Sequence, residues 1–441
     1  MLHHRNRTVR WCRERWSRTL QFLGTALLVV GLAACGTSAQ GSEQPAANTS
    51  PITAAATPSI PSASPSASPS STPSASPTAG GVTGTVAVGA QGGAAWVVTA
   101  SEFRSTTDQG AHWSSTPLPA GFTANLGIAA SIGPNGALWL LSASGNTASF
   151  YQAAGPGNPW SRTTISVTWP TQTQVPSSPE FVAPGRDVAV FGSSAPGIIT
   201  AVVTEGNTGL ARVMLLSTDS GKTFAQHNPP TLHGDWHPAF ISATSGVIEG
   251  NGVFVNGTPT VEPGAIYATT DGGASWKPMT LPSDSRPDVS LLGAPLVNGS
   301  HIYLTANMPT DDGWRLALYS GDNGQSFTVQ GSVTVSKANS NAAPLVGVDG
   351  SNVWMVTGPA TGSSTIFESS DGGANWKAVP APALTPEFAT VGIGLHGNAA
   401  TIWQSMSNCP GSKSTCAPVA VLSATTDSAQ HWHQVAVPSP S

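Results

Sequence analysis

One eight-residue pattern recurs along this chain and limits the folds that the chain can adopt. The pattern is Ser/Thr-x-Asp-x-Gly-x-x-aromatic, and its five full copies are Thr106 to Trp113, Ser217 to Phe224, Thr269 to Trp276, Ser320 to Phe327 and Ser369 to Trp376. Two further copies are incomplete, because Thr425 to Trp432 has Ala429 at the glycine position and Ala153 to Trp160 has Gly155 at the aspartate position. Successive copies lie roughly fifty residues apart, which is the length of a four-stranded propeller blade. The seven copies therefore predict seven blades.

Each residue type of the pattern suits a tight turn between two strands. An aspartate can accept hydrogen bonds from the backbone N–H groups that follow it, and a glycine two positions later can take a positive φ. The aromatic residue then begins the next strand and packs inward. We therefore predict that six aspartates have a structural role in closing hairpins: Asp108, Asp219, Asp271, Asp322, Asp371 and Asp427.

Short apolar stretches with an aromatic residue precede most copies of the pattern. They are residues 94–98, 137–141, 252–255, 301–304, 352–356 and 401–403. Runs of this kind, bounded by Gly, Asn and Pro, are typical of β-strands, and no amphipathic helix pattern of useful length follows residue 81. The sequence predicts an all-β domain over residues 81–441, a seven-bladed β-propeller with four-stranded antiparallel blades.

The repeated pattern resembles the Asp-box, or BNR, repeat of sialidases, sortilin-type receptors and photosystem II stability/assembly factor-like propellers. The copy from Thr269 to Trp276 reads Thr-Thr-Asp-Gly-Gly-Ala-Ser-Trp and is most similar to the last of these groups. The resemblance covers roughly residues 84–441 and implies a propeller fold. Since proteins with unrelated activities share this repeat, it does not imply a particular function.

The N-terminal residues have the features of an export signal. Residues 1–21 contain six arginines and one glutamate, and residues 22–34 form an apolar run that is short for a membrane span. The run ends in Leu-Ala-Ala-Cys-Gly, which resembles the bacterial lipobox, whose cysteine becomes the lipidated first residue of the mature protein. We predict a lipoprotein signal peptide over residues 1–34, a lipid anchor on Cys35, and localisation at the outer face of the cell membrane. A plain signal peptide with an incidental cysteine is the alternative.

Residues 35–80 have a composition that cannot form a packed core. Ser, Ala, Thr and Pro dominate, Glu43 is the only charged residue, and Pro61, Pro65, Pro69, Pro73 and Pro77 recur every four residues. Such segments stay disordered and favour extended polyproline-like conformations. At about 3.1 Å per residue this predicted tether could reach on the order of 140 Å.

The charge and the cysteines limit the partners of the predicted domain. The net charge of the chain is −5, and the signal region carries six arginines against one glutamate, so the remainder carries −10. An acidic surface with few charges argues against nucleic acid as a partner. Cys409 and Cys416 could close a loop by a disulfide outside the cytoplasm, whereas two cysteines alone do not complete a metal site. We expect neither a metal nor a cofactor.

The loops opposite the predicted hairpins are where we expect a ligand site. If the repeats join third and fourth strands, as in the families they resemble, they occupy one face of the disc and leave the loops of the other face available for binding. Two clusters are expected there: Asp235, Trp236 and His237, and then Asp311, Asp312 and Trp314. The first cluster could bind a polar ligand or a metal, or could pack as an ordinary connector. The second could bind a cation or supply carboxylates for glycoside hydrolysis, or could be a solvated turn.

The sequence favours a binding or scaffold module over an enzyme. The alternative, a sialidase-like glycoside hydrolase, needs convergent arginines, a tyrosine nucleophile with a glutamate partner and an aspartate acid. Arg104 directly precedes a repeat instead of starting the first blade, so the resemblance assigns no catalytic residue. The assembly factors bind membrane-protein intermediates through a basic face, whereas this domain is acidic. We therefore expect a monomeric propeller that binds an unidentified protein or glycan and is attached to the membrane by its lipid anchor.

Overall fold

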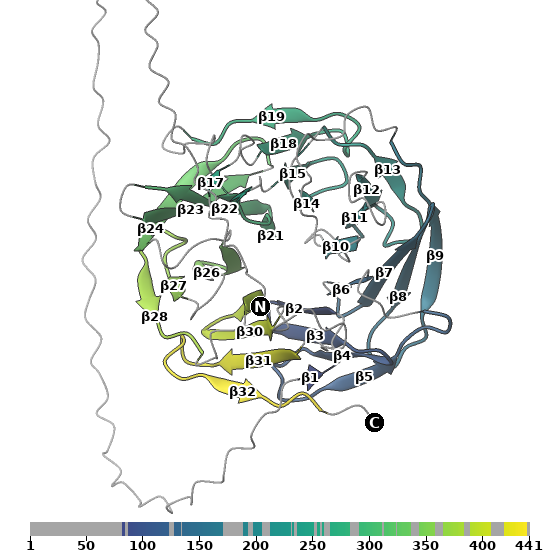
Figure 1. Cartoon of the computed structure of the whole chain (residues 1–441), viewed down its shortest axis with the longest axis horizontal. Coiled ribbons are helices and arrows are strands. Elements are labelled where there is room, and N and C mark those ends of the chain that lie inside the picture. The colour runs from purple at the N-terminus through teal and green to yellow at the C-terminus, as the bar shows by residue number, and fades with distance from the viewer. Residues whose placement is uncertain are drawn as a thin grey trace, which may run out of the picture. The chain divides into compact units, whose positions relative to one another are not determined.

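A computed structural model shows seven blades arranged in a ring (Figure 1). It describes residues 82–83, 87–122, 128–133, 135–170, 188–192, 197–204, 212–230, 232, 236–250, 254–255, 258–259, 265–282, 291–310, 313–322, 324–336, 344–357, 365–382, 389–406 and 419–438. All regular secondary structure in these residues is β-strand. Among them, no helix is long and apolar enough to cross a membrane. The predicted all-β propeller with seven four-stranded antiparallel blades is confirmed, whereas the signal peptide, Cys35 and the tether lie outside the described residues.

The strands of each blade follow one another in the sequence. Blade 1 contains β2 (Ala87–Gln91), β3 (Ala94–Val98), β4 (Glu102–Thr106) and β5 (Ser114–Pro117). Blade 2 contains β6 (Ile128–Ile132), β7 (Leu138–Ser144), β8 (Thr147–Ala153) and β9 (Ser161–Ser166). Blade 3 contains β10 (Val188–Gly192), β11 (Ile199–Thr204), β12 (Arg212–Ser217) and β13 (Ala225–His227). Blade 4 contains β14 (Trp236–Phe240), β15 (Gly246–Gly250), β18 (Ala265–Thr269) and β19 (Lys277–Met279). Blade 5 contains β20 (Leu291–Leu292) and β21 (Leu296–Asn298), which both pair with β22 (His301–Pro309), followed by β23 (Gly313–Asp322) and β24 (Thr328–Ser336). Blade 6 contains β25 (Leu345–Asp349), β26 (Asn352–Thr357), β27 (Thr365–Ser369) and β28 (Lys377–Val379), and blade 7 contains β29 (Ala389–His396), β30 (Ala399–Met406), β31 (Val419–Thr425) and β32 (His433–Val435).

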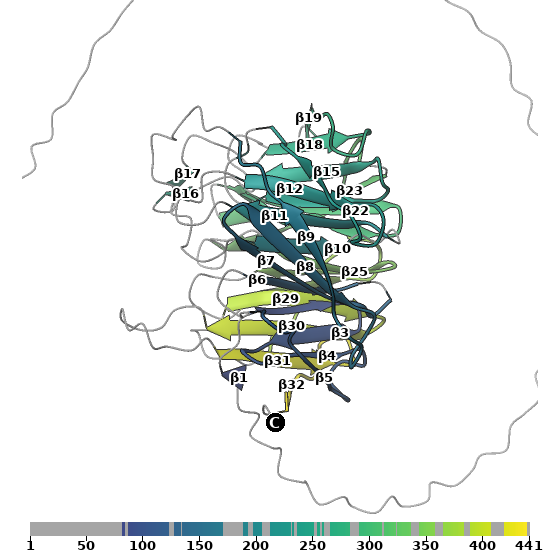
Figure 2. The same ribbon diagram turned by 90° about the vertical axis from the view of Figure 1, so that its right-hand side faces the viewer.

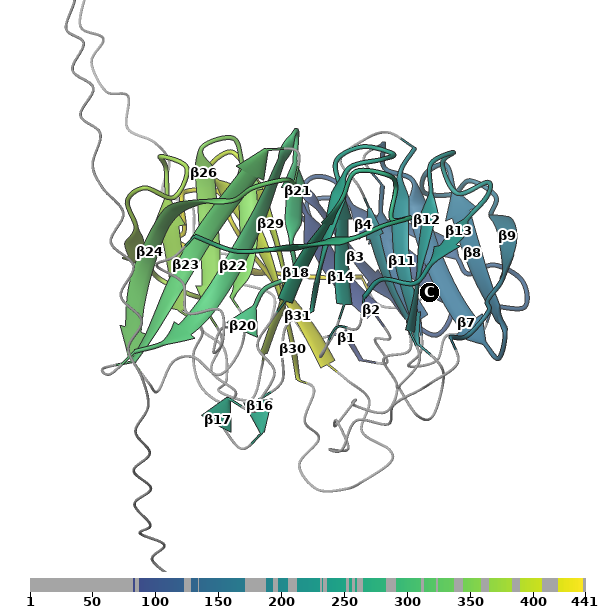
Figure 3. The same ribbon diagram turned by 90° about the horizontal axis from the view of Figure 1, so that it is seen from above.

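The antiparallel order of the strands places each connection on a defined face of the disc. The first strand of a blade lies nearest the centre of the ring and the fourth lies at its perimeter (Figure 1). Because neighbouring strands run in opposite directions, the hairpins between first and second strands and between third and fourth strands share one face. We call this face the hairpin face. The second-to-third connections and the links between blades lie on the opposite face, seen edge-on in Figure 3.

One predicted strand lies outside the four-stranded sheet of its blade. Residues 252–255 were expected to form a blade strand, but the second strand of blade 4 is β15, which pairs with β14 on one side and β18 on the other. Since both edges of β15 are occupied, Phe254–Val255 forms β16 and pairs only with β17 (Thr258–Pro259). This two-stranded hairpin belongs to the connection between β15 and β18 and projects to one side of the disc (Figure 2).

The two ends of the propeller meet in blade 7. The short strand β1 (Val82–Thr83) pairs with one end of β31, where Val82 lies opposite Ala420. The other end of β31 pairs with β32, where Leu422 lies opposite Val435. Backbone hydrogen bonds from both ends of the domain therefore close the ring on the same strand.

The core consists of seven hydrophobic clusters, one at each boundary between neighbouring blades. Alternate residues of a strand enter different clusters, because both faces of a blade are covered. In β8, Phe150 packs toward blade 3 with Leu215, and the next residue, Tyr151, packs toward blade 1 with Phe103. Burial on both faces explains why the strands appear in the sequence as continuous apolar runs.

The aromatic residue that ends each repeat packs against the preceding blade. Trp432 of blade 7 meets Trp354 of blade 6 edge-to-face at 6.1 Å, and Trp113 of blade 1 meets Trp403 of blade 7 at 6.5 Å. The indole Nε1 of Trp432 also donates a hydrogen bond of 2.7 Å to the carbonyl of Pro380 in blade 6. The repeat therefore closes a hairpin within its own blade and also joins two blades.

Candidate functional site

Five of the seven repeats form hairpins that are closed by an aspartate. We call these the acid hairpins; their aspartates are Asp108, Asp219, Asp271, Asp371 and Asp427. In blade 4, Asp271 Oδ1 accepts hydrogen bonds from the Thr269 hydroxyl and from the backbone N–H of Ser275, both at 2.8 Å. The Ser275 hydroxyl donates to the second carboxylate oxygen at 2.5 Å. The carboxylate thus accepts bonds from both ends of its turn.

The residue after the aspartate joins each acid hairpin to the first hairpin of its own blade. In blade 4, Gly272 N–H donates to the carbonyl of Thr244 at 2.9 Å, and Gly273 N–H donates to the Thr269 hydroxyl at 2.8 Å. This geometry needs a positive φ at the residue after the aspartate. The angle is +71° at Gly272, and non-glycine residues adopt it at Gln109, with +61°, and at Ser220, with +62°.

The acid hairpins hold their carboxylates in the ionised form. Hydrogen bonds from the residue four positions after the aspartate are the main cause, and they lower the pKa of each of the five aspartates from 3.8 to about 2. A carboxyl group with so low a pKa is a poor proton donor near neutral pH. Its acceptor positions are also occupied by the turn, so these aspartates act as structural acceptors.

Blade 5 differs from the acid hairpins, although its repeat matches the pattern in full. Asp322 is the last residue of β23, and its Oδ1 lies 2.9 Å from Nε2 of His301, its cross-strand partner at the start of β22. The imidazole of His301 in turn stacks with Tyr303 at 6.3 Å. The carboxylate of Asp322 is therefore bound to the neighbouring strand.

The hairpin of blade 2, between β8 and β9, closes without an acid. Gly155 replaces the aspartate, and Pro156 and Pro159 replace two of the residues whose backbone N–H groups donate in the acid hairpins. The N–H of Gly157 donates to the Thr116 hydroxyl of blade 1 at 3.0 Å, whereas the acid hairpins use a hydroxyl of their own strand. The sequence changes thus remove donors together with the acceptor and transfer one bond to the neighbouring blade.

The structure places part of the two predicted ligand clusters. Trp236 and His237 begin β14, the first strand of blade 4, and Trp314 is the second residue of β23, the third strand of blade 5. All three lie toward the face opposite the hairpin face, because first and third strands start there. The other predicted residues lie outside the described residues: Asp235, Asp311 and Asp312, with Cys409 and Cys416 of the predicted disulfide.

Trp236 and His237 join two residues that the sequence analysis did not select. His237 Nδ1 lies 2.5 Å from Oε1 of Glu249, its cross-strand partner on β15, and the Glu249 side chain is fully buried. The Arg212 guanidinium, from the start of the third strand of blade 3, lies over the Trp236 ring at 5.9 Å from its centroid. We call these four residues the boundary cluster. Trp236 and Arg212 lie on the side of blade 4 that faces blade 3, whereas His237 and Glu249 lie on its other side, toward blade 5, because side chains alternate along β14 and β15.

The residues of the boundary cluster are held in place by their contacts. Trp236 Nε1 donates to the carbonyl of Leu232 at 3.2 Å, so the orientation of the ring is held while it contacts the cation. The side chain of His237 is 22% exposed, and its hydrogen bond to a buried carboxylate fixes the position of the imidazole. Among the residues that the structure describes, no group of three or more His, Cys, Asp or Glu side chains could hold a metal ion.

A signal for Glu249 was present in the sequence. It lies in the stretch Gly-Val-Ile-Glu-Gly, where a single acid interrupts an apolar strand. A buried glutamate usually needs a partner, so this position indicates a paired site. The partner could not be read from the sequence, because the pairing of β14 with β15 decides which residue lies opposite.

Comparison with known proteins identifies neighbours in fold. No protein-family model and no curated protein matches this chain. Among solved structures, it is similar to YCF48 bound to a D1 peptide, with a TM-score of 0.41, 14% identity, and coverage of 74% of this chain and 89% of that one. A PL25 ulvan lyase matches with a TM-score of 0.41, 12% identity, and coverage of 81% and 94%. The Aleuria aurantia lectin, in complex with a fucosylated GlcNAc, matches with a TM-score of 0.39, 13% identity, and coverage of 71% and 96%.

The fold itself defines the class of this chain. It is a seven-bladed all-β propeller, with acid hairpins on one face and a polar aromatic cluster toward the other. At the identities found, the likeness to these structures concerns the fold alone.

Proposed function

We propose that this chain is an exported, lipid-anchored propeller of the Asp-box type that binds a protein or glycan ligand on the face opposite its hairpins. The boundary cluster carries the proposal. It presents an indole ring under a guanidinium on the blade 3 side of β14 and an imidazole held by a buried carboxylate on the blade 5 side. On the hairpin face, by contrast, the five aspartates of the acid hairpins are already occupied by their own turns. Positioned side chains on the loop-bearing face of a rigid scaffold are typical of binding sites.

The carboxylates favour binding over glycoside hydrolysis. Hydrolysis by paired carboxylates needs one carboxyl group with a raised pKa to act as the acid. The buried Glu102 is hydrogen-bonded by Arg104, which lowers its pKa, and the buried Glu368 is paired with Lys377 at 3.1 Å. The carboxylate of Glu102 is therefore held as an anion.

The arginines and tyrosines also argue against the sialidase-like alternative. Three of the described arginines contact a partner within their own blade: Arg104 contacts Glu102, Arg162 contacts Ser149 and Arg315 contacts Ser332. The four tyrosines lie in strands: Tyr151, Tyr267, Tyr303 and Tyr319 pack in or against the clusters between blades. Burial raises the pKa of Tyr303, which disfavours its ionisation as a nucleophile.

Binding at the boundary cluster can be tested with two matched histidines. The full chain is screened in detergent against a glycan array and, by cross-linking, against intact cell envelopes. His237→Ala should weaken the binding that is found at least tenfold, about 1.4 kcal/mol. His112→Ala is the control, because His112 makes the same kind of contact, Nδ1 to Asp108 at 2.6 Å, on the hairpin face. If only the control variant lost binding, the ligand site would not lie at the boundary cluster. Release of reducing sugar from a glycan would favour the glycoside-hydrolase alternative.

The lipid anchor can be tested separately. Its support is the arginine-rich start, the apolar run before Cys35 and the small residues that precede this cysteine. Cys35→Ser should abolish labelling by an alkynyl fatty acid and partition into the membrane fraction. Cys12→Ser, within the same signal region, should retain both. Unchanged labelling of Cys35→Ser would refute the anchor.

A further inference from the structure

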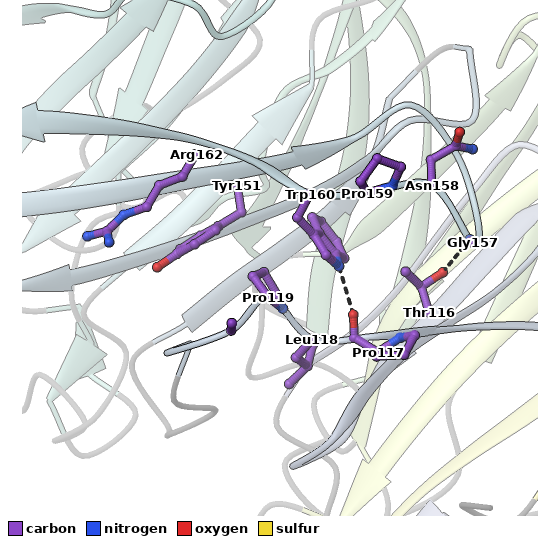
Figure 4. A pocket seen from close by; sticks show the side chains of 11 residues that line it. Thr116, Pro117, Leu118, Pro119, Tyr151, Gly157, Asn158, Pro159, Trp160 and Arg162 are labelled. Carbon is purple, nitrogen blue, oxygen red and sulfur yellow. Dashed lines mark hydrogen bonds between the residues drawn. The ribbon is translucent and has the colours of Figure 1, made fainter.

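An open pocket of about 560 Å³ lies at the outer rim between blades 1 and 2 (Figure 4). Blade 1 contributes the end of β5 and the residues that follow it, and blade 2 contributes the end of its hairpin, the start of β9 and Tyr151 of β8. The volume is in the range of sites for small molecules. The pocket is distinct from the boundary cluster, which lies around the start of β14 in blade 4.

An indole ring with a fixed position forms one wall of the pocket. Trp160 Nε1 donates to the carbonyl of Pro117 at 2.7 Å, and the ring packs at 6.3 Å against Phe103. Because its single donor is used, Trp160 can offer a ligand only its π face. The negative face of an aromatic ring attracts polarised C–H groups, such as those on the apolar side of a sugar ring.

A guanidinium with a fixed position forms the other end of the pocket. Arg162 lies over the ring of Tyr151 at 5.5 Å, and its Nη2 donates to the Ser149 hydroxyl at 2.8 Å. The side chain of Arg162 is exposed, and it is the only charged side chain that lines the pocket. A planar guanidinium in a defined orientation suits a carboxylate, which it can bind with two parallel hydrogen bonds.

The unusual hairpin of blade 2 removes the charge that would oppose an anion here. Five other blades carry an ionised aspartate at the position of Gly155. The hairpin presents Asn158 instead, whose Nδ2 donates back to the carbonyls of Gly155 and Pro156 at 3.3 and 3.4 Å. In Figure 4, Trp160 lies between Arg162 and Asn158. The one repeat that lacks its acid is therefore the one beside the pocket.

We infer that this rim pocket binds an acidic sugar unit, a uronate within a glycan chain. The carboxylate of one unit pairs with Arg162, and the apolar face of a neighbouring unit in the same chain stacks on Trp160, because Tyr151 lies between these two side chains in Figure 4. A proline-rich peptide could also stack on the indole, but proline carries no charge to pair with the exposed guanidinium. This site goes beyond the proposed function, since it is separate from the boundary cluster.

Calorimetry on the full chain tests the inference. The probes are tetrasaccharides of galacturonate, mannuronate and hyaluronan, with maltotetraose and cellotetraose as neutral counterparts. At least one uronate probe should bind, at least tenfold more tightly than the neutral ones, and more weakly as salt is added. Arg162→Met should weaken this binding at least tenfold. Arg315→Met is the matched control, because Arg315 also donates to a serine on a neighbouring strand, Ser332, in blade 5.

A second pair of variants tests the charge without touching Arg162. A Cβ added at Gly155 would have its nearest neighbour at 3.6 Å, an ordinary contact, so a side chain fits there. Gly155→Asp should weaken uronate binding at least tenfold, whereas Gly155→Asn, of the same shape, should bind as the wild type does. His237→Ala should not affect this binding, which separates the pocket from the proposed function.

Three results would overturn the inference. The first is that no uronate probe binds the wild-type chain. The second is that Arg162→Met, shown by thermal unfolding to be folded, binds as tightly as the wild type. The third is that a synthetic peptide of residues 61–77 binds in place of the uronates and binds Arg162→Met equally well, which would assign the pocket to proline-rich chains.

Discussion

The hairpins of blade 4 and blade 2 occupy equivalent places in the ring but are closed by different bonds. In blade 4, the carboxylate of Asp271 and the hydroxyl of Thr269 satisfy the turn from within the blade. In blade 2, prolines remove two donors, and Thr116 of blade 1 supplies the hydroxyl. The acid hairpin is therefore sensitive to pH and local to its blade, whereas the hairpin of blade 2 is uncharged and depends on its neighbour.

Low pH should produce the largest difference between the two kinds of hairpin, because it should destabilise the acid hairpins before the hairpin of blade 2. The five aspartates have a pKa of about 2 in the folded protein, below their ordinary value of 3.8. Their contribution to stability is therefore present above about pH 4 and is lost as the pH falls toward 2. Hydrogen exchange read by mass spectrometry between pH 5 and pH 2.5 should show protection factors falling first in the acid hairpins. Equal or earlier loss in the hairpin of blade 2 would contradict this comparison.

Removal of the hydroxyl within blade 4 should have the next largest effect. Thr269→Val keeps the shape of the side chain but leaves the N–H groups of Asp271 and Gly273 without their acceptor. We expect a loss of about 2 kcal/mol in the free energy of unfolding, measured with urea. Thr270→Val, at the exposed neighbouring position, is the control and should change stability by less than about 0.5 kcal/mol. A similar small change for Thr269→Val would show that its hydroxyl does not hold the turn.

Removal of the hydroxyl that blade 1 supplies to blade 2 should have a smaller effect. Thr116→Val leaves one N–H, that of Gly157, without its partner, so we expect a loss of about 1 kcal/mol. Ala153 occupies the position of the hydroxyl residue in the acid hairpins. Adding Ala153→Ser to Thr116→Val should recover about half of the loss. Without any recovery, the two hydroxyl positions would not be equivalent.

Relief of backbone strain should have the smallest effect. Gln109 has a φ of +61° where blade 4 has Gly272 with +71°. Gln109→Gly should raise the free energy of unfolding by about 0.5 kcal/mol, because the strain relieved exceeds the entropy that glycine adds to the unfolded chain. The reverse change, Gly272→Gln, should lower stability by more, since its Cβ would lie 3.0 Å from the carbonyl of Ala243. Effects of the same sign in both variants would rule out strain as the cause.

The candidate sites were predictable only in part. Trp236 and His237 stood out in the sequence as an aromatic and a polar residue in a connector, but Glu249 and Arg212 become their partners through strand pairing and blade packing. The sequence analysis did not identify the rim pocket, because its walls come from two blades. The repeat containing Asp322 matched the pattern in full, yet pairing with His301 gave its carboxylate a different partner.

The repeat by itself determined the fold class, the number of blades and the position of each hairpin. It could do so because its hydrogen bonds are local, joining residues within a few positions of one another, and because its spacing equals the length of one blade. The tertiary structure alone decided which blade supplies the hydroxyl of the blade-2 hairpin, which carboxylate meets His237, and where a pocket opens. These features depend on contacts between strands of one blade, as for His237 and Glu249, or between blades, as for Thr116 and Gly157. Strand pairing and the packing of neighbouring blades set such distances.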